Sequence, residues 1–113
     1  MKQTDFKTIM DSISIPSTYY SFPEKEVPVP PYFVWYFSGS DNFSADNTVY
    51  AQIEIPVIEL YSKRRSITSE QAIETVLNNS GFFWNKSMNY VESEQLFQII
   101  YELGEIKFDG EQN

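Results

Sequence analysis

The side chains that most often carry out catalysis are absent from this chain. It contains no histidine and no cysteine, so the commonest general base, the commonest transition-metal ligand and any thiolate nucleophile are missing. The segment Ser38-Gly39-Ser40 lacks the G-x-S-x-G form of a nucleophile elbow, and no histidine is present to activate either serine. The sequence therefore predicts neither nucleophilic catalysis nor a zinc–sulfur site.

Carboxylates are the remaining candidates for acid–base chemistry. Either Glu54 with Glu59 or Glu92 with Glu94 could supply the two carboxyl groups that glycoside hydrolysis requires. Nothing in the sequence predicts the cleft that such a pair must flank, and exposed strand residues are the simpler interpretation. We therefore expect no catalytic residue, no cofactor and no enzymatic activity.

Four oxygen-bearing side chains fall within one polar segment, namely Asp41, Asn42, Asp46 and Asn47. Their spacing does not match a calcium-binding loop, because the terminal bidentate glutamate is missing. Aspartate and asparagine also favour turns, which is the interpretation we adopt. No metal site is expected.

The composition indicates one domain over residues 1–113 with a surplus of aromatic rings. The chain has nine phenylalanines, eight tyrosines and two tryptophans in 113 residues, which is more than one small core needs. Tyrosine and tryptophan are favoured at protein interfaces. We therefore expect some of the rings on the surface or at subunit contacts.

The net charge of −8 disfavours non-specific binding to nucleic acid, which depends on cationic side chains that neutralise phosphates. One local exception is the run Lys63-Arg64-Arg65, which forms either a solvated loop or a contact with an acidic partner. No apolar run is long enough to span a membrane, and the N-terminus lacks the apolar core of a signal peptide. We expect synthesis in the cytoplasm and no membrane association.

A long β-hairpin over residues 31–62 is the main structural prediction. Two strand-forming segments, 32–37 and 49–61, flank a polar loop at 38–48. Both faces of the first strand are apolar, which predicts that its second face meets a helix, another sheet or another subunit. Phe43 either packs back on the hairpin or inserts into a partner. A bulge near Pro56 would keep the apolar residues on both sides of it facing one core.

Two helices and a second strand pair complete the prediction. Apolar spacing predicts an amphipathic helix over 5–13 with its N-cap at Gln3 or Thr4, and a helix over 68–79 that starts with a Thr68–Gln71 capping box and ends at Gly81. Segment 16–22 suggests an edge strand, 24–31 a proline-rich connection, 82–90 and 96–103 two strands, and 109–113 a flexible polar tail. The predicted fold is an α+β two-layer sandwich, with an antiparallel sheet, a long hairpin and two helices on one face.

The order of these segments resembles small proteins from the head–tail module of long-tailed bacteriophages and prophages, in particular tail terminator (head–tail joining) proteins. The features that carry the resemblance are the aromatic strand with its SGSDNFSADN loop, the strand ending IELYSK and the later YVESEQLFQIIYEL strand. The resemblance covers about residues 5–106.

This resemblance implies a structural virion protein that is assembled in the host cytoplasm. Such proteins commonly form hexameric rings that cap the tail tube and dock it to the head connector, so a homo-oligomer, the tube and the connector are the expected partners. Another connector adaptor, a tail-assembly protein or a small acidic inhibitor are the alternatives. The residues we expect at subunit or partner contacts are Tyr36, Asn42, Phe43, Tyr50, Arg64 and Arg65.

Overall fold

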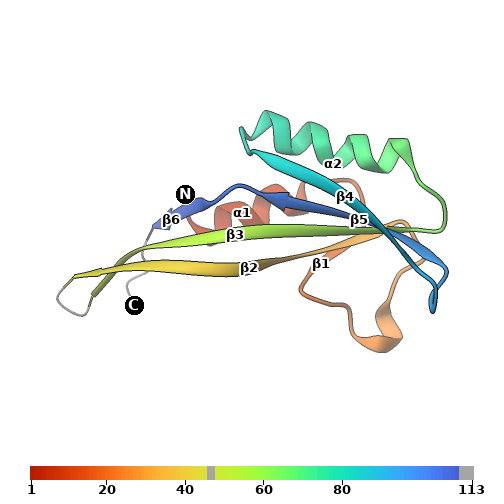
Figure 1. The fold of residues 1–113 in the computed structure, drawn as a ribbon, viewed down its shortest axis with the longest axis horizontal. Helices are drawn as coiled ribbons and strands as arrows, with labels where there is room; N and C mark the ends of the chain where they lie inside the picture. The colour runs from red at the N-terminus through yellow and green to blue at the C-terminus, as the bar shows by residue number, and fades with distance from the viewer. Residues whose placement is uncertain (46–47, 110–113) are drawn as a thin grey trace.

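The chain folds into a six-stranded, mostly antiparallel sheet with two helices packed on one face (Figure 1), which confirms the predicted α+β class. The structure, a computed structural model, describes residues 1–45 and 48–109, and for 40–45 and 48–52 it describes the backbone alone. The elements are α1 (Gln3–Asp11), β1 (Ser17–Tyr19), the 3-10 turn η1 (Glu24–Glu26), β2 (Tyr32–Ala45), β3 (Thr48–Ser62), α2 (Ile67–Asn79), β4 (Trp84–Val91), β5 (Leu96–Leu103) and β6 (Ile106–Asp109).

Strand β3 is central to the sheet, because it pairs with β2, β5 and β6. The strand order is β1-β2-β3-β5-β4, and β6 pairs with β3 beyond the end of β5. β2 runs antiparallel to β3 along most of its length, while the short β1 runs parallel to β2 and covers only its residues 33–35. Beyond Trp35, no described strand pairs with that edge of β2.

The helix starts differ from the predictions because other residues provide the caps. The backbone N–H of Lys2 donates to Asp5 Oδ2 at 2.8 Å, so α1 begins at Gln3 with Lys2 as its N-cap. In α2 the hydroxyl oxygen of Ser66 accepts from the backbone N–H of Ser69 at 3.2 Å. The predicted caps at Gln3 or Thr4 and the predicted Thr68–Gln71 box are therefore wrong by one or two residues.

The C-terminal end of α2 follows the prediction. Gly81 has a φ of +76°, a left-handed conformation that glycine adopts at the lowest cost, and it comes directly after the C-cap Ser80. The chain can then reverse, and β4 begins at Trp84 rather than at residue 82. β5 occupies the predicted residues 96–103, whereas β6 was not predicted.

The polar segment predicted as a loop is mostly strand. Backbone pairing continues from Ser40↔Glu54 to Ala45↔Thr48, so the loop expected over 38–48 is wrong for residues 38–45 and 48, while residues 46–47 lie outside the described part of the chain. A polar sequence does not prevent this pairing, because the ladder is made by backbone groups.

The bulge predicted near Pro56 lies on the opposite strand. Phe37 pairs with Pro56 and Ser40 pairs with Glu54, so β2 holds one residue more than β3 at this point. β3 itself keeps its regular alternation. Ile58 and Leu60 therefore join the core under the helices, while Ile55 and Val57 face the other side, and the expectation that these residues share one face is wrong.

The core lies between the helices and the sheet and is dominated by rings. Phe6 on α1 is fully buried and contacts the rings of Trp35, Phe37, Phe82 and Phe108 at centroid distances of 5.5–6.2 Å. The predicted surplus of rings is confirmed, since Tyr19, Tyr20, Phe83 and Tyr90 are half or more exposed.

The second face of the sheet is partly covered by the connection between β1 and β2. The Phe22 ring packs edge-on against Tyr32 at 5.6 Å, and the Tyr20 ring lies 5.9 Å from that of Tyr36. The aromatic strand 32–37 therefore has apolar residues on both faces because this connection, rather than a third layer, shields its outer side.

Candidate interaction surfaces

The far half of the β2–β3 hairpin projects from the body as an arm, defined here as residues 40–45 and 48–52 (Figure 1). Asn42 and Phe43 lie in its outgoing strand, paired with Gln52 and Ala51, and Tyr50 lies at a second register shift where Phe43↔Ala51 gives way to Ser44↔Val49. The three predicted contact residues are therefore on the arm. Their side chains, and hence their contacts, lie outside the described part of the chain.

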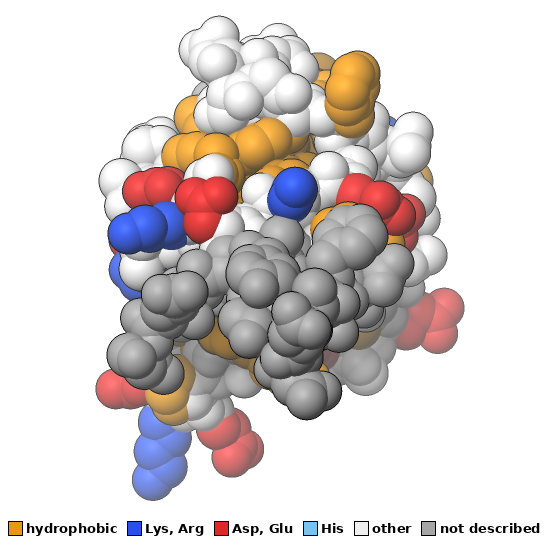
Figure 2. All heavy atoms as spheres, turned by 90° about the vertical axis from the view of Figure 1, so that its left-hand side faces the viewer, with side chains coloured by type: hydrophobic (Ala, Val, Ile, Leu, Met, Phe, Trp, Pro, Cys, Tyr) orange, Lys and Arg blue, Asp and Glu red, His pale blue; other side chains and the backbone are white. Residues whose placement is uncertain are grey.

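A hollow of about 390 Å³ lies at the base of the arm. Ile55, Phe83, Trp84 and Leu103 line it together with Glu102 and Glu105. Phe83 is 86% exposed, although phenylalanine is among the residues most often buried. Figure 2 views this end of the molecule and shows hydrophobic side chains gathered beside acidic and basic ones. The arm therefore rises next to an apolar surface.

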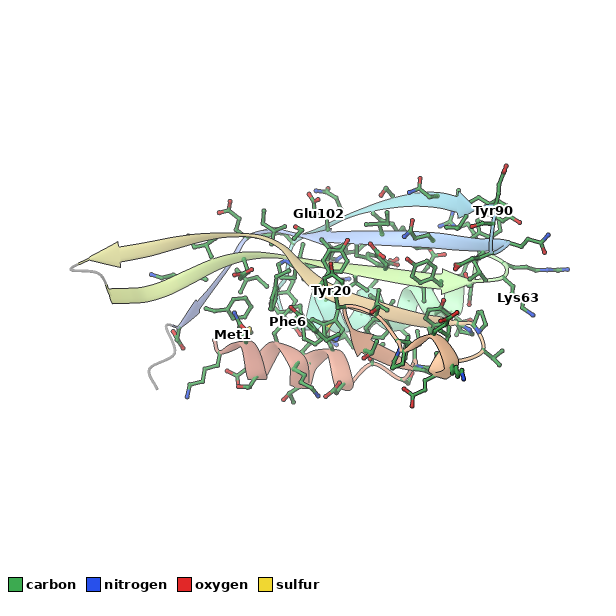
Figure 3. All side chains as sticks on the ribbon, turned by 90° about the horizontal axis from the view of Figure 1, so that it is seen from below. Met1, Phe6, Tyr20, Lys63, Tyr90 and Glu102 are labelled. Atoms are coloured by element: carbon green, nitrogen blue, oxygen red, sulfur yellow. The ribbon has the colours of Figure 1, made fainter. Side chains whose placement is uncertain are left out.

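The basic run lies at the other end of the molecule. Lys63 and Tyr90 are found at the end opposite the arm (Figure 3), and the longest dimension of the protein is 50 Å. Arg64 is exposed and forms no ion pair with a described residue. Arg65 is different, because its guanidinium donates to Glu70 Oε1 at 2.8 Å within the same chain. Arg64 is therefore a better candidate than Arg65 for a docking contact, because its charge is not paired with a described residue.

Glu70 is the centre of an ion-pair cluster between α2 and β4. Its side chain is only 5% exposed, and it binds both Arg65 and Lys86, while Lys86 also reaches Glu74 at 2.8 Å. The hydroxyl of Tyr101 donates to Glu74 as well. Burial would raise the pKa of Glu70, but the hydrogen bonds and charges of Arg65 and Lys86 outweigh it and lower that pKa below its ordinary value.

Glu70→Gln is expected to lower the free energy of unfolding at neutral pH by about 1–3 kcal/mol, because it removes a buried, doubly paired charge. Since the folded-state pKa is lowered, the contribution of Glu70 is present above the unfolded-state pKa and is lost as the pH falls through the folded one. Urea denaturation across the acid range measures both effects. Asp11→Asn, which removes the exposed Lys7–Asp11 pair, should change the stability by less than about 0.5 kcal/mol. Equal effects of the two variants would contradict the assigned role of the cluster.

A chain of hydrogen bonds crosses the helix-free face of the sheet from β4 to β2. Asn89 donates to Gln98 at 3.4 Å, Gln98 to the Tyr61 hydroxyl at 2.8 Å, and Tyr61 to Glu59 Oε1 at 2.8 Å. The Tyr36 hydroxyl donates to the other oxygen, Glu59 Oε2, at 2.6 Å. The predicted contact residue Tyr36 is therefore half-buried and bound within the chain.

This network was not predicted from the sequence, although the spacing of two of its residues indicated part of it. Glu59 and Tyr61 are two residues apart on β3 and so lie on the same face of that strand. The partner positions on β2 and β5 depend on the register of the pairing, which the sequence alone does not provide. Burial, the hydrogen bond to Glu59 and its negative charge raise the pKa of Tyr36 to about 12.

We expect Tyr36 to ionise near pH 12 in the folded protein. Because the unfolded chain releases this proton at the ordinary value of about 10, stability should fall as the pH rises between the two values. Phenolate absorbance, followed together with circular dichroism to monitor folding, measures both. Tyr36→Phe should remove one high-pH step, and Glu59→Gln should lower the pKa of Tyr36. Ionisation of Tyr36 at its ordinary value in a folded chain would exclude the hydrogen bond.

No protein-family model matches the chain, and no curated protein matches it. Among the described residues, no helix is long and apolar enough to cross a membrane. In the same residues, no group of three or more acidic side chains is arranged to hold a metal ion.

Proposed function

We propose that the chain is a structural virion protein of a long-tailed bacteriophage or prophage, a tail terminator (head–tail joining) protein that caps the tail tube and docks it to the head connector. The observation that supports this proposal most directly is the arm, where the backbone pairing of β2 with β3 extends well beyond the last pair between β3 and β5. An element of this kind is suited to contacts with a neighbouring molecule.

The placement of the two candidate contact regions favours assembly into a ring. The arm and the basic run lie at opposite ends of the molecule (Figure 3). A contact between two different surfaces of identical chains is heterologous, and such contacts generate closed rings when the rotation between subunits closes. In this proposal Asn42, Phe43 and Tyr50 contact the next subunit or the tail tube, and Arg64 faces an acidic neighbour.

The electrostatics of the chain are consistent with a DNA-conducting ring. With a net charge of −8, each subunit lacks the excess of lysine and arginine that binds phosphates tightly. A ring of such subunits repels DNA rather than holding it. Passage of the genome through the ring would therefore meet no strong binding site.

Genetic context and particle morphology test the proposal. We expect the neighbouring genes to encode tail-tube and head-connector proteins, and electron microscopy of particles that lack this protein to show unjoined heads with overlong tail tubes. Complementation in trans should restore joined particles. Unattached tails of normal length would instead indicate a connector adaptor, and a gene outside any phage cluster would contradict the proposal.

Arg64→Glu is expected to leave the stability unchanged and to reduce head–tail joining several-fold, because charge reversal at the rim of an interface opposes association with an acidic surface. The matched control is Lys25→Glu, which reverses another exposed charge in η1. Recovery of joined particles from purified heads, tails and added protein gives the readout. Equal joining by the two variants would remove Arg64 from the docking surface.

A further inference from the structure

A second hollow, of about 220 Å³, lies on the helix-free face of the sheet, where the connection after β1 passes over β2 and β3. Aromatic rings and carboxylates dominate its lining, and no lysine or arginine contributes to it. Figure 3 shows one of the rings, Tyr20, beside β2. The principal lining residues are Tyr20, Phe22, Tyr32, Tyr61, Glu59 and Glu94.

The rings form a preorganised platform. Tyr32 and Tyr61 lie on neighbouring strands with centroids 5.3 Å apart and planes only 26° from parallel. Phe22 stands almost perpendicular to Tyr32, at 89°. Such faces carry negative quadrupole potential and attract a cation placed over them.

The two carboxylates reinforce that preference. Glu59 is held in place because each of its oxygens accepts one tyrosine hydroxyl, and each oxygen keeps a lone pair for a further donor. Glu94 accepts no hydrogen bond from a described side chain, although its charge is close enough to raise the pKa of Tyr32, after the effect of burial. The hollow therefore carries the negative charges of two carboxylates with free hydrogen-bond acceptor sites, and no lysine or arginine lines it.

We propose that this hollow binds the guanidinium group of an arginine side chain from another protein. A guanidinium is planar, stacks on aromatic faces and donates to carboxylates through a fixed fork, which matches a nearly parallel ring pair beside Glu59. A quaternary ammonium could use the rings but could not donate to the carboxylates. The proposal concerns only this recognition site and does not depend on the virion role.

Titration of the full chain with N-acetyl-L-arginine amide tests the site. We expect saturable shifts of the Tyr32 and Tyr61 ring signals in NMR spectra, with a dissociation constant on the order of millimolar. The neutral isostere N-acetyl-L-citrulline amide should bind at least about tenfold more weakly, and tetramethylammonium should also bind more weakly than the arginine probe. Equal binding of either control compound, or no saturable shift, would overturn the proposal.

Variants in the β4–β5 turn separate a local site from the general negative field of the protein. Glu94→Gln should weaken binding of the arginine probe about threefold, whereas Glu92→Gln, in the same turn but outside the lining, should not. Tyr20→Ala removes a ring that is 68% exposed and lies outside the core cluster under the helices, and it should also weaken binding. Unchanged spectra elsewhere show that each variant is folded. Equal effects of Glu92→Gln and Glu94→Gln would refute the site.

Discussion

Phe6→Ala is expected to lower the free energy of unfolding by about 3–5 kcal/mol, the range for truncating a fully buried phenylalanine. The ring is completely buried and contacts four other rings from three parts of the chain, namely Trp35 and Phe37 on β2, Phe82 after α2 and Phe108 on β6. Its loss opens a cavity where α1 meets the sheet. Since small domains have a total stability of about 5–15 kcal/mol, the variant should be only marginally folded.

Chemical denaturation followed by tryptophan fluorescence measures this change, because Trp35 lies 5.5 Å from the Phe6 ring. The matched control is Phe83→Ala, which removes the same atoms from a side chain that is 86% exposed. The control should stay within about 0.5 kcal/mol of the parent. A loss of less than about 1 kcal/mol for Phe6→Ala would mean that α1 is not anchored to the sheet through this ring.

The second large effect is expected on assembly. Replacing residues 43–51 with Asn-Gly closes the hairpin at the Asn42↔Gln52 pair by a two-residue turn, and it keeps the pairs of Gln52–Glu54 with β6. The shortened chain should fold, since no described core residue is removed. It should fail to form rings or to bind tail tubes, as should a simple deletion of residues 40–47.

Sedimentation of the protein alone and co-sedimentation with tail tubes give the two readouts, because the ring could require the tube for its formation. The control is Asp11→Asn, which changes an exposed residue of α1 outside the arm. That variant should assemble like the parent. Full ring mass or unchanged tube binding by the arm variant would show that the contacts lie elsewhere.

Local patterns predicted the elements that carry their own signals. α2 was predicted from its apolar spacing and from Gly81, and β5 from its alternation of apolar and polar residues. β6 has only four residues, too few for a period to emerge, although Phe108 within it is fully buried. Residues 38–48 were predicted as a loop because their polar composition resembles that of turns, whereas backbone pairing of 40–45 with 48–54 decides the structure there.

The features that matter for interaction depend on contacts that local patterns do not encode. The pairing of Glu70 with both Arg65 and Lys86 requires α2 to lie against β4. The tyrosine network around Glu59 requires the β2–β3–β5 register, and the hollow above it requires the path of the proline-rich connection. The elements could be predicted from their residues, but which side chains come into contact is determined by the tertiary fold.

The brevity of β1 has a practical consequence for handling the protein. It leaves one side of β2 without a described strand from Tyr36 to Ala45, and exposed edges of this length invite fibril growth in concentrated samples. Each molecule carries a charge of −8, and the resulting repulsion keeps such edges apart. Salt screens this repulsion, and its range falls to about 3 Å at 1 M salt. Storage in dilute buffer of low ionic strength should therefore preserve the sample longest.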